Sequence, residues 1–295
     1  MSRAPATARR LFDRFEPVHA VTYFTPEARS AFDAVGFRGF WMGYFAGRSA
    51  PLGSVPTPVV TAIFYNFAPS HIARALPSAW EFASPLDALR ARESSAVAAL
   101  HRCGVTADDA SATVAGLLEK AARSAPLDGR PLFAANLALP WPEDPVAKLW
   151  HATTLLREQR GDGHVALLAG AGISGRDCNV LHCVADRVPR DFIVRSRQYD
   201  DDEWRACVER LVERGVLDET TALTTEGHAL KRHLEDTTDR LALAAFDALD
   251  DDELEVLFRT LTPLTRKVLA GGDIPAATPM GLSRADLDDD EAHVR

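Results

Sequence analysis

Two helical patterns joined by a very short connection mark the C-terminal half of the chain. The first covers residues 203–217, and the second begins at Thr225 and continues to about Leu243. Between them Gly215 favours the end of a helix, and the Ala-Leu-Thr sequence at 222–224 is typical of the start of a strand. The segment is therefore expected to fold as helix, turn, strand and helix in one packed unit.

The same order of elements occurs in winged helices, a fold best known for reading DNA. Here Leu223-Thr224-x-x-Gly227 resembles the element that ends the wing in MarR-type regulators. This resemblance covers the residues from 203 to 243. It implies that the helix beginning near residue 203 is the recognition helix, the element that enters a DNA groove.

Short phrases spread over nearly the whole chain are similar to an actinobacterial family of winged-helix-like proteins. That resemblance implies a helix-turn-helix fold and no particular activity. The phrases are Glu16-Pro17-x-His19-Ala20, Arg38-Gly39-Phe40-Trp41, Phe64-Tyr65-Asn66-Phe67, Leu149-Trp150-His151-Ala152 and Arg160-Gly161-Asp162-Gly163-His164.

The two halves of the chain repeat a similar order of motifs. In the first half Trp80 lies 42 residues after Arg38, and in the second Trp204 lies 44 residues after Arg160. Between the arginine and the tryptophan, each half passes through a turn, an apolar helix and a proline. We therefore predict a mainly α fold of two tandem degenerate winged-helix units with short β-wings, and a pocket between them.

Composition along the chain sets the expected boundaries. Prolines are dense before residue 145 and resist a continuous helix, and the last residues are punctuated by proline and glycine and then acidic. The basic residues 1–10 are expected to fray. The predicted parts are an N-terminal helical half at 1–124, a proline-rich crossover at 125–145, a C-terminal winged-helix half at 146–275 and a flexible acidic tail at 276–295.

Capping residues locate three helices in the first half. Thr25 precedes a helix that starts with Pro26, and Ser84 precedes a helix over Pro85–Arg102. A third is expected from about Asp108 to Ser124. The β-branched run at 59–64 is compatible with either a strand or a buried helix.

Charge opposes DNA binding by the presumed recognition helix. Residues 200–215 carry six acidic and three basic side chains, and the presumed wing at 218–222 adds two acids and no base. Affinity for DNA comes largely from neutralising phosphates with Lys and Arg. The net charge of −9 also works against non-specific binding to nucleic acid. The sequence therefore disfavours nucleic acid as a partner.

A ligand-responsive, MarR-like transcription regulator stays open as an alternative. It would need a basic surface built from residues outside the acidic helix. Four arginines that precede this helix could supply it: Arg187, Arg190, Arg195 and Arg197.

The sequence also bears on location. No apolar run reaches the roughly 18 residues that a bilayer crossing needs, so we expect no membrane association. In a chain without an export signal, cysteines are most simply free thiols in a reducing cytoplasm. The cysteines concerned are Cys103, Cys178, Cys183 and Cys207.

Polar residues cluster in the second half of the chain. Glycines at 161 and 163 are expected to form a turn that lets a ligand approach the backbone, with Asp162 orienting His164 as a general base. The structural alternative is that Asp162 caps a helix and the histidine is a satisfied core residue. His151, Arg157 and His182 complete the predicted ligand-binding set, with Arg157 holding an anion.

An aromatic set in the first half is the expected counterpart. It consists of His19, Trp41, Tyr44, Tyr65 and Asn66. Aromatic residues at helical spacing are commonly core, but buried Tyr and Trp need partners for their polar atoms. Aromatic faces combined with Arg and His suit a planar, anionic organic molecule.

We therefore predict a cytoplasmic protein that binds a small planar or anionic molecule between its two halves, with transformation of this molecule as an open alternative. The alternatives are the DNA-binding regulator and an interaction scaffold without a ligand. No metal site is predicted, because the His and Cys spacing matches no compact zinc signature. No nucleotide-binding or serine-hydrolase motif occurs, so the cofactor stays unknown.

Overall fold

A computed structural model of the chain describes residues 3–186, 188–276, 278 and 280–293, which form fourteen α-helices and three short 3₁₀ helices. The first half contains α1 (Pro5–Phe24), α2 (Pro26–Ala34), α3 (Gly39–Ser49), α4 (Thr57–Phe64), α5 (Pro69–Ala73), α6 (Pro85–Arg102), α7 (Asp109–Ser124) and α8 (Pro131–Leu137). The second half contains α9 (Pro145–Gly170), α10 (Gly175–Asp186), α11 (Arg190–Arg197), α12 (Asp201–Glu213), α13 (Thr225–Leu243) and α14 (Asp251–Ala270). The 3₁₀ helices are η1 (Ala50–Leu52), η2 (Ser78–Glu81) and η3 (Ala244–Phe246).

Side-chain caps start several of these helices. Thr25 accepts a hydrogen bond from the backbone of Ala28 at the start of α2, and Ser84 forms a reciprocal capping box with Asp87 at the start of α6. Asp108 caps α7 by accepting a hydrogen bond from the backbone of Ser111. The predicted helices therefore form close to their expected residues, because the capping groups satisfy otherwise unpaired backbone donors.

The predicted β-wings are wrong. The described residues contain no strand, and their only β-type pairing is an isolated antiparallel bridge between Leu217 and Leu223. Asp218 holds the connection in a tight turn, because its side chain accepts hydrogen bonds from the backbone of Thr220 and Ala222. Thr224 then caps α13 directly, which leaves no residues to extend a strand. The β-branched run at 59–64 lies in α4.

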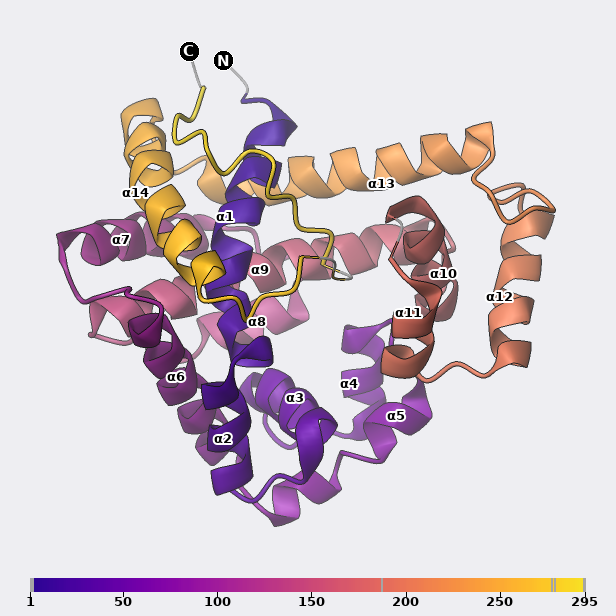
Figure 1. Cartoon of the computed structure of the whole chain (residues 1–295), viewed down its shortest axis with the longest axis horizontal. Coiled ribbons are helices and arrows are strands. Elements are labelled where there is room, and N and C mark those ends of the chain that lie inside the picture. Colours follow the sequence, from indigo (N-terminus) through magenta and orange to yellow (C-terminus); the bar gives the residue numbers. More distant parts are fainter. Residues whose placement is uncertain (1–2, 187, 277, 279, 294–295) are drawn as a thin grey trace.

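Two central helices, α1 and α9, organise the molecule (Figure 1). The first packs against α2, α6, α9, α13 and α14, and the second against α1, α6, α7, α8 and α13. Because neighbours surround them, both bury polar side chains, including Glu16 of α1 and Glu158 of α9. Residues 5–10, which we expected to fray, belong to α1. None of the helices in the described ranges is long and apolar enough to cross a membrane.

The buried apolar residues form three main clusters. The largest joins α1, α6 and α7 to α9 and α14, and so combines residues from both predicted halves. The second lies among α2–α6, and the third lies among the end of α9 and helices α10–α13. The predicted crossover contains a helix, α8, which packs on α9. The proposed boundaries at residues 124 and 146 remain a prediction.

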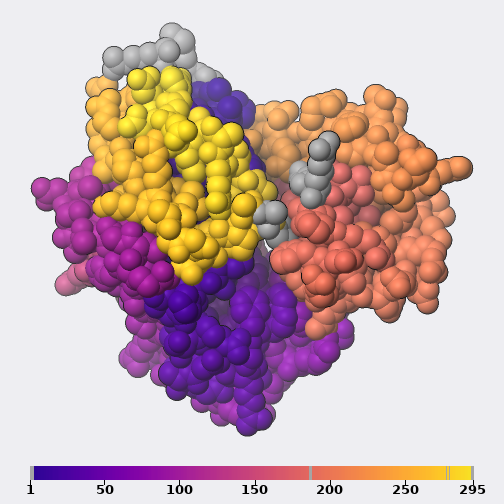
Figure 2. Space-filling model, viewed as in Figure 1, coloured from indigo at the N-terminus to yellow at the C-terminus, as the bar shows by residue number. Residues whose placement is uncertain are grey.

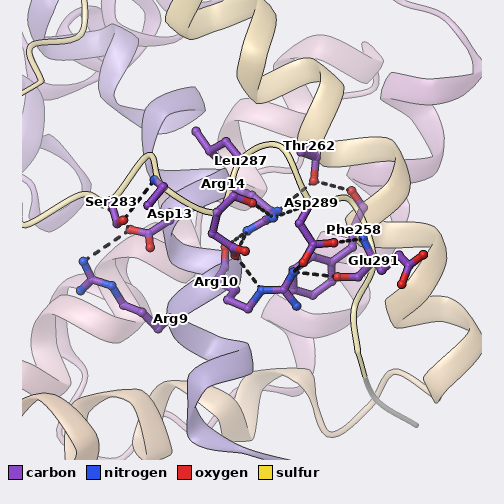
Figure 3. A network of polar contacts seen from close by, with 12 residues as sticks. Arg9, Arg10, Asp13, Arg14, Phe258, Thr262, Ser283, Leu287, Asp289 and Glu291 are labelled. Carbon is purple, nitrogen blue, oxygen red and sulfur yellow. Dashed lines mark hydrogen bonds and ion pairs between the residues drawn. The ribbon is translucent and has the colours of Figure 1, made fainter.

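The acidic tail lies along α1, although composition predicts a flexible segment there (Figure 3). Arg14 is completely buried, and its guanidinium donates to the backbone carbonyls of Asp286 and Asp289. Arg10 forms ion pairs with the carboxylates of the same two residues, at 2.6 and 2.9 Å. Figure 2 shows the tail on the surface between α14 and the lobe formed by α10–α13. Arginines of α1 therefore bind the tail through both its carboxylates and its backbone.

A direct contact between backbones joins the first half of the chain to α10. A Cβ atom at Gly175 would overlap the carbonyl oxygen of Tyr65. Two hydrogen bonds hold the loop in this position. The Tyr65 hydroxyl donates to the carbonyl of Ile173, and Asn179 Nδ2 donates to the carbonyl of Asn66 over 2.8 Å. Only glycine fits at position 175 with this arrangement of the loop.

We predict that Gly175→Ala lowers the free energy of unfolding by at least about 2 kcal/mol, because the added methyl group must displace backbone rather than a flexible side chain. Chemical denaturation measures this effect. Gly170→Ala is the matched control, since a Cβ at Gly170 meets no atom within 4 Å. Equal stability of the two variants would show that the loop does not hold this position in solution.

Candidate functional site

A cavity of about 390 Å³ lies where the second and third apolar clusters face each other. Helices α3 and α4 and the loop at 65–67 form one side, and α9, α10, α11 and α13 form the other. Tyr23 and Phe24 of α1 and Met280 of the tail also reach it. The predicted site residues that line it are Trp41, Tyr44, Tyr65, Asn66, Arg157, Asp162, His164 and His182. Both halves of the chain therefore contribute to one cavity.

Aromatic rings form the wall from the first half. Trp41 and Tyr44 are one turn apart on α3, with ring centroids 5.6 Å apart in an edge-to-face arrangement. Phe67 lies 5.6 Å from Tyr44 and 5.8 Å from Trp41. Tyr23 of α1 continues the wall at 5.2 Å from Tyr44. Such a wall offers ring faces and edges to a planar molecule.

Tyr65 lines the cavity in a strained backbone conformation. Its φ of 52° and ψ of −61° make it the centre of a γ-turn, in which the amide of Asn66 donates to the carbonyl of Phe64 over 2.6 Å. This conformation is rare for a residue with a side chain. Strain of this kind persists only where the surrounding structure holds the residue in place, and it is found mainly at functional sites.

A buried carboxylate lies between two arginines behind the aromatic wall. Arg48 of α3 donates to both oxygens of Glu158, at 3.1 and 3.0 Å, and Arg157 donates to the same carboxylate at 2.8 Å. Burial by itself would raise the pKa of Glu158, yet Arg157 and Arg48 hold it well below its ordinary value. Glu158 is therefore ionised, and it fixes α3 against α9.

Arg197 brings a further positive charge to the cavity. Its guanidinium lies 4.2 Å from the ring centroid of Phe67. No carboxylate among the described residues lies within ion-pair distance of it, and its Nε is buried without a hydrogen-bond acceptor. Burial lowers the pKa of Arg197, which reflects the cost of keeping this charge out of water.

The lining as a whole is positively charged. Four basic side chains, those of Arg48, Arg157, Arg197 and Lys231, face the acidic side chains of Asp162 and Glu235 across the described lining. Lys231 forms an ion pair with Glu235 at 2.7 Å. Even with Glu158 counted behind the wall, an excess of one positive charge remains.

Asp162 does not pair with His164. Helix α9 runs unbroken through residues 161–164, so the expected glycine turn is absent. Asp162 Oδ2 instead accepts hydrogen bonds from the backbone amides of Leu132 and Phe133, both at 2.9 Å, at the start of α8. Burial raises the pKa of Asp162 to about 6. Asp162 is thus a helix cap, as in the structural alternative, but for a different helix from the one expected.

His164 is oriented by Thr238 of α13. The Thr238 hydroxyl donates to the carbonyl of Leu234 over 2.7 Å, so its oxygen accepts from His164 Nδ1 over 2.9 Å. This arrangement leaves Nε2 of His164 as the nitrogen with a free lone pair. Burial lowers the pKa of His164 to about 4, so the ring is neutral at physiological pH.

Two predicted residues do not line the cavity. His19 is buried behind it, with Nδ1 2.9 Å from the hydroxyl of Thr154 and Nε2 3.0 Å from that of Tyr23. It therefore positions Tyr23, which does line the cavity. His151 packs edge-to-face on Trp141 in the core, with ring centroids 4.9 Å apart. Burial lowers the pKa of both histidines.

A second cavity, of about 480 Å³, adjoins the first on the side of α13 and the tail. Glu16 of α1 lines it and is fully buried. Arg157 Nε lies 3.5 Å from Oε1 of Glu16, but among the described residues no group donates a hydrogen bond to either oxygen. Burial raises the pKa of Glu16 to about 7, against the opposing effect of Arg157.

The predicted site did not include several charged residues of these cavities, among them Glu16, Arg48 and Arg197, nor Glu158 behind the aromatic wall. One signal was available for Glu16, since apolar residues occur on every side of α1 and indicate a helix buried all round. Nothing in the sequence pairs Arg48 with Glu158, which is 110 residues away. Within the described ranges, no group of three or more His, Cys, Asp or Glu side chains is placed to hold a metal ion.

The contribution of Glu16 to the free energy of unfolding should fall as pH rises. Its pKa is raised from 4.5 to about 7, so its contribution to folding is full below pH 4.5 and is lost as pH rises to about 7. Relative to wild type, Glu16→Gln should therefore gain at most about 3 kcal/mol in the free energy of unfolding between these limits. Urea denaturation across this range measures the difference.

Glu235→Gln is the control for this prediction. Burial opposes ionisation of Glu235, but Lys231 lowers its pKa below the ordinary value, so the carboxylate stabilises the fold at neutral pH and this contribution is lost on acidification. Glu235→Gln should lose stability relative to wild type as pH rises. If the free energies of unfolding of wild type and Glu16→Gln changed in parallel with pH, the assignment of the raised pKa to Glu16 would be contradicted.

Comparisons with known proteins place the chain in a family without adding a close relative. Neither a curated protein nor a solved structure matches it. One family model, described as a helix-turn-helix family, matches residues 8–275 and so covers nearly all of the helices. The chain therefore belongs to this helix-turn-helix family.

Proposed function

We propose that this protein binds a small planar organic anion in the cavity between α3–α4 and α9–α11. The observation that carries the proposal is Arg197, a partly buried guanidinium whose Nε is out of contact with water and has no hydrogen-bond acceptor, and which no carboxylate of the described residues neutralises. Buried charges in proteins are normally paired, because an isolated charge out of water is costly. An anionic group of a ligand would supply the missing partner, and Arg offers a planar set of donors for a carboxylate or sulfonate.

The size and wall of the cavity support the same class of ligand. A volume of about 390 Å³ falls within the range of small-molecule sites, and such sites are mostly apolar with a few placed polar groups. The rings of Trp41, Tyr44 and Phe67 supply the apolar part. Because side chains leave this space open, the cavity supports a ligand-binding protein over a scaffold without a ligand.

His164 is the candidate general base if the ligand is transformed. Its neutral ring presents a lone pair on Nε2, and Thr238 fixes its orientation. Asp162 is not part of this function, since both of its short hydrogen bonds go to the backbone of α8.

The tandem arrangement of two degenerate units is also a proposal. In the first unit the order is α3, α4, α5 and then η2, which contains Trp80. In the second unit the corresponding order is the C-terminal end of α9, then α10, α11 and α12, which contains Trp204. A proline lies at the start of the third element in both series: Pro69 is the first residue of α5, and Pro189 is the N-cap of α11. The cavity would then lie between equivalent elements of the two units.

A ligand-responsive, MarR-like DNA-binding regulator is the second candidate, because the family is a helix-turn-helix family. The surface of α12 disfavours it. Asp201 and Asp202 begin this helix with side chains 80% and 89% exposed, and they pair with Arg190 and Arg205. Arg197 is turned into the cavity. Of the other arginines that favoured a basic surface, Arg195 is exposed and Arg187 lies outside the described residues.

The resemblance to MarR-type regulators, the actinobacterial origin and the cytoplasmic location are also proposals. The four free cysteines are compatible with a reducing compartment and support the last of these.

We predict that Arg197→Met weakens binding of naphthalene-2-sulfonate, a planar aromatic anion, at least tenfold, because the charge-assisted hydrogen bonds to the sulfonate are lost. Isothermal titration calorimetry measures the affinity. Arg195→Met, an exposed position on the same helix, is the matched control and should bind as wild type does. Equal affinity of the two variants would rule out Arg197 as the anion partner.

We also predict that duplex DNA from the upstream region of its own gene is not retarded by the protein in a native gel at low salt. As a control for sensitivity, the double charge reversal Asp201→Lys with Asp202→Lys should create weak, salt-dependent retardation. Retardation by the wild-type protein that weakens with salt would favour the regulator over the ligand-binding protein.

A further inference from the structure

The two cavities share part of their lining. Arg157, Gly161 and His164 of α9 border both of them, as do His182, Lys231, Glu235 and Met280. Aromatic rings form one wall of the first cavity, whereas half of the residues that line the second are charged. They therefore lie on the two sides of one short stretch of α9.

Glu16 marks the second cavity as a built site. Its side chain is fully buried, and among the described residues neither oxygen accepts a hydrogen bond. An unsatisfied buried carboxylate is costly, because it gives up hydration without replacement. The neighbouring guanidinium of Arg157 lies 3.5 Å away and already donates to Glu158. Both oxygens of Glu16 are thus available to a donor that enters the cavity.

Gly161 separates the two cavities without a side chain. It lies inside α9, where glycine costs roughly 1 kcal/mol relative to alanine. A Cβ there would meet only Glu158 and Arg157, at 3.8 and 3.9 Å, which are ordinary contacts. Gly163 differs, because a Cβ at that position would crowd the guanidinium of Arg130 at 2.9 Å. Packing explains Gly163 and does not explain Gly161.

We propose that the two cavities are compartments of one site joined across Gly161, and that Glu16 accepts a hydrogen bond from a hydroxyl or amino group of the ligand. This inference rests on the proposed function, because the aromatic compartment and Arg197 hold the other end of the same molecule. The ligand class is then an aromatic anion that also carries a hydrogen-bond donor.

The charges around Glu16 favour a neutral donor over a cationic one. Arg157 lies beside the carboxylate, and the second cavity is also lined by Arg9 and Arg160. Arg160 is paired with Asp239 at 2.6 Å, which compensates its charge. In the described lining four basic side chains face three acidic ones, Glu16 included, so one positive charge is in excess. A cation beside Glu16 would be repelled by Arg157, whereas a hydroxyl or a neutral aromatic amine would not.

The first test compares naphthalene-2-sulfonate with its monohydroxylated isomers at about pH 8, where Glu16 is mostly ionised. At least one isomer should bind wild-type protein about tenfold more tightly than the parent compound, since a hydrogen bond to a carboxylate is charge-assisted. Glu16→Met should abolish this preference and leave the affinity for the parent compound unchanged.

The outcomes separate the two proposals. If the parent compound does not bind, the proposed function fails. If it binds and no isomer is preferred, or if the preference survives in Glu16→Met, the two-compartment site fails while the proposed function stands.

The second test replaces Gly161, because this substitution removes no charge. Gly161→Ala and Gly161→Leu should raise the midpoint of thermal unfolding of the ligand-free protein or leave it unchanged, and should progressively remove the preference for the hydroxylated isomer. Gly116→Ala is the matched control, because Gly116 lies inside α7 and a Cβ there meets no atom within 4 Å. An undiminished preference in Gly161→Leu would show that the cavities are not joined at this residue.

Discussion

Glu158 binds Arg48 and Arg157 at once, and its side chain is only 3% exposed. Removing one member of such a buried group leaves an uncompensated charge, so the three residues hold one another in place. Because Arg48 belongs to α3 and the other two to α9, this contact fixes the aromatic wall against the central helix. The cavity, the position of Tyr44 and the neighbourhood of Glu16 all depend on it.

The chain belongs to a helix-turn-helix family, yet the exposed face of α12 is acidic, and positive charge is in excess in the lining of an internal cavity. In a DNA-binding protein the positive charge lies on the surface that meets phosphates. Here α12 presents Asp201 and Asp202 to solvent, and an arginine of the preceding helix turns inward over Phe67. The architecture therefore turns toward the cavity an arginine that no carboxylate among the described residues neutralises.

Local rules recovered much of the fold and part of the site. Thr25 and Ser84 located helix starts, and the spacing of Trp41 and Tyr44 placed both on one face of α3. The pairing of Asp162 with His164 failed because an unbroken helix turns residues two apart to different sides. The ion pair of Arg48 with Glu158 could not be inferred, since it joins helices far apart in sequence.

By its composition alone, the acidic C-terminal segment would be taken for a tail that can be removed without effect. In the folded protein it accepts three of the hydrogen bonds of Arg14, a guanidinium with no access to water, and it carries Met280 to the edge of both cavities. A protein shortened at residue 275 would expose that guanidinium and open the cavities on one side. Loss of ligand binding in such a truncated protein would then report a missing wall and not a missing activity.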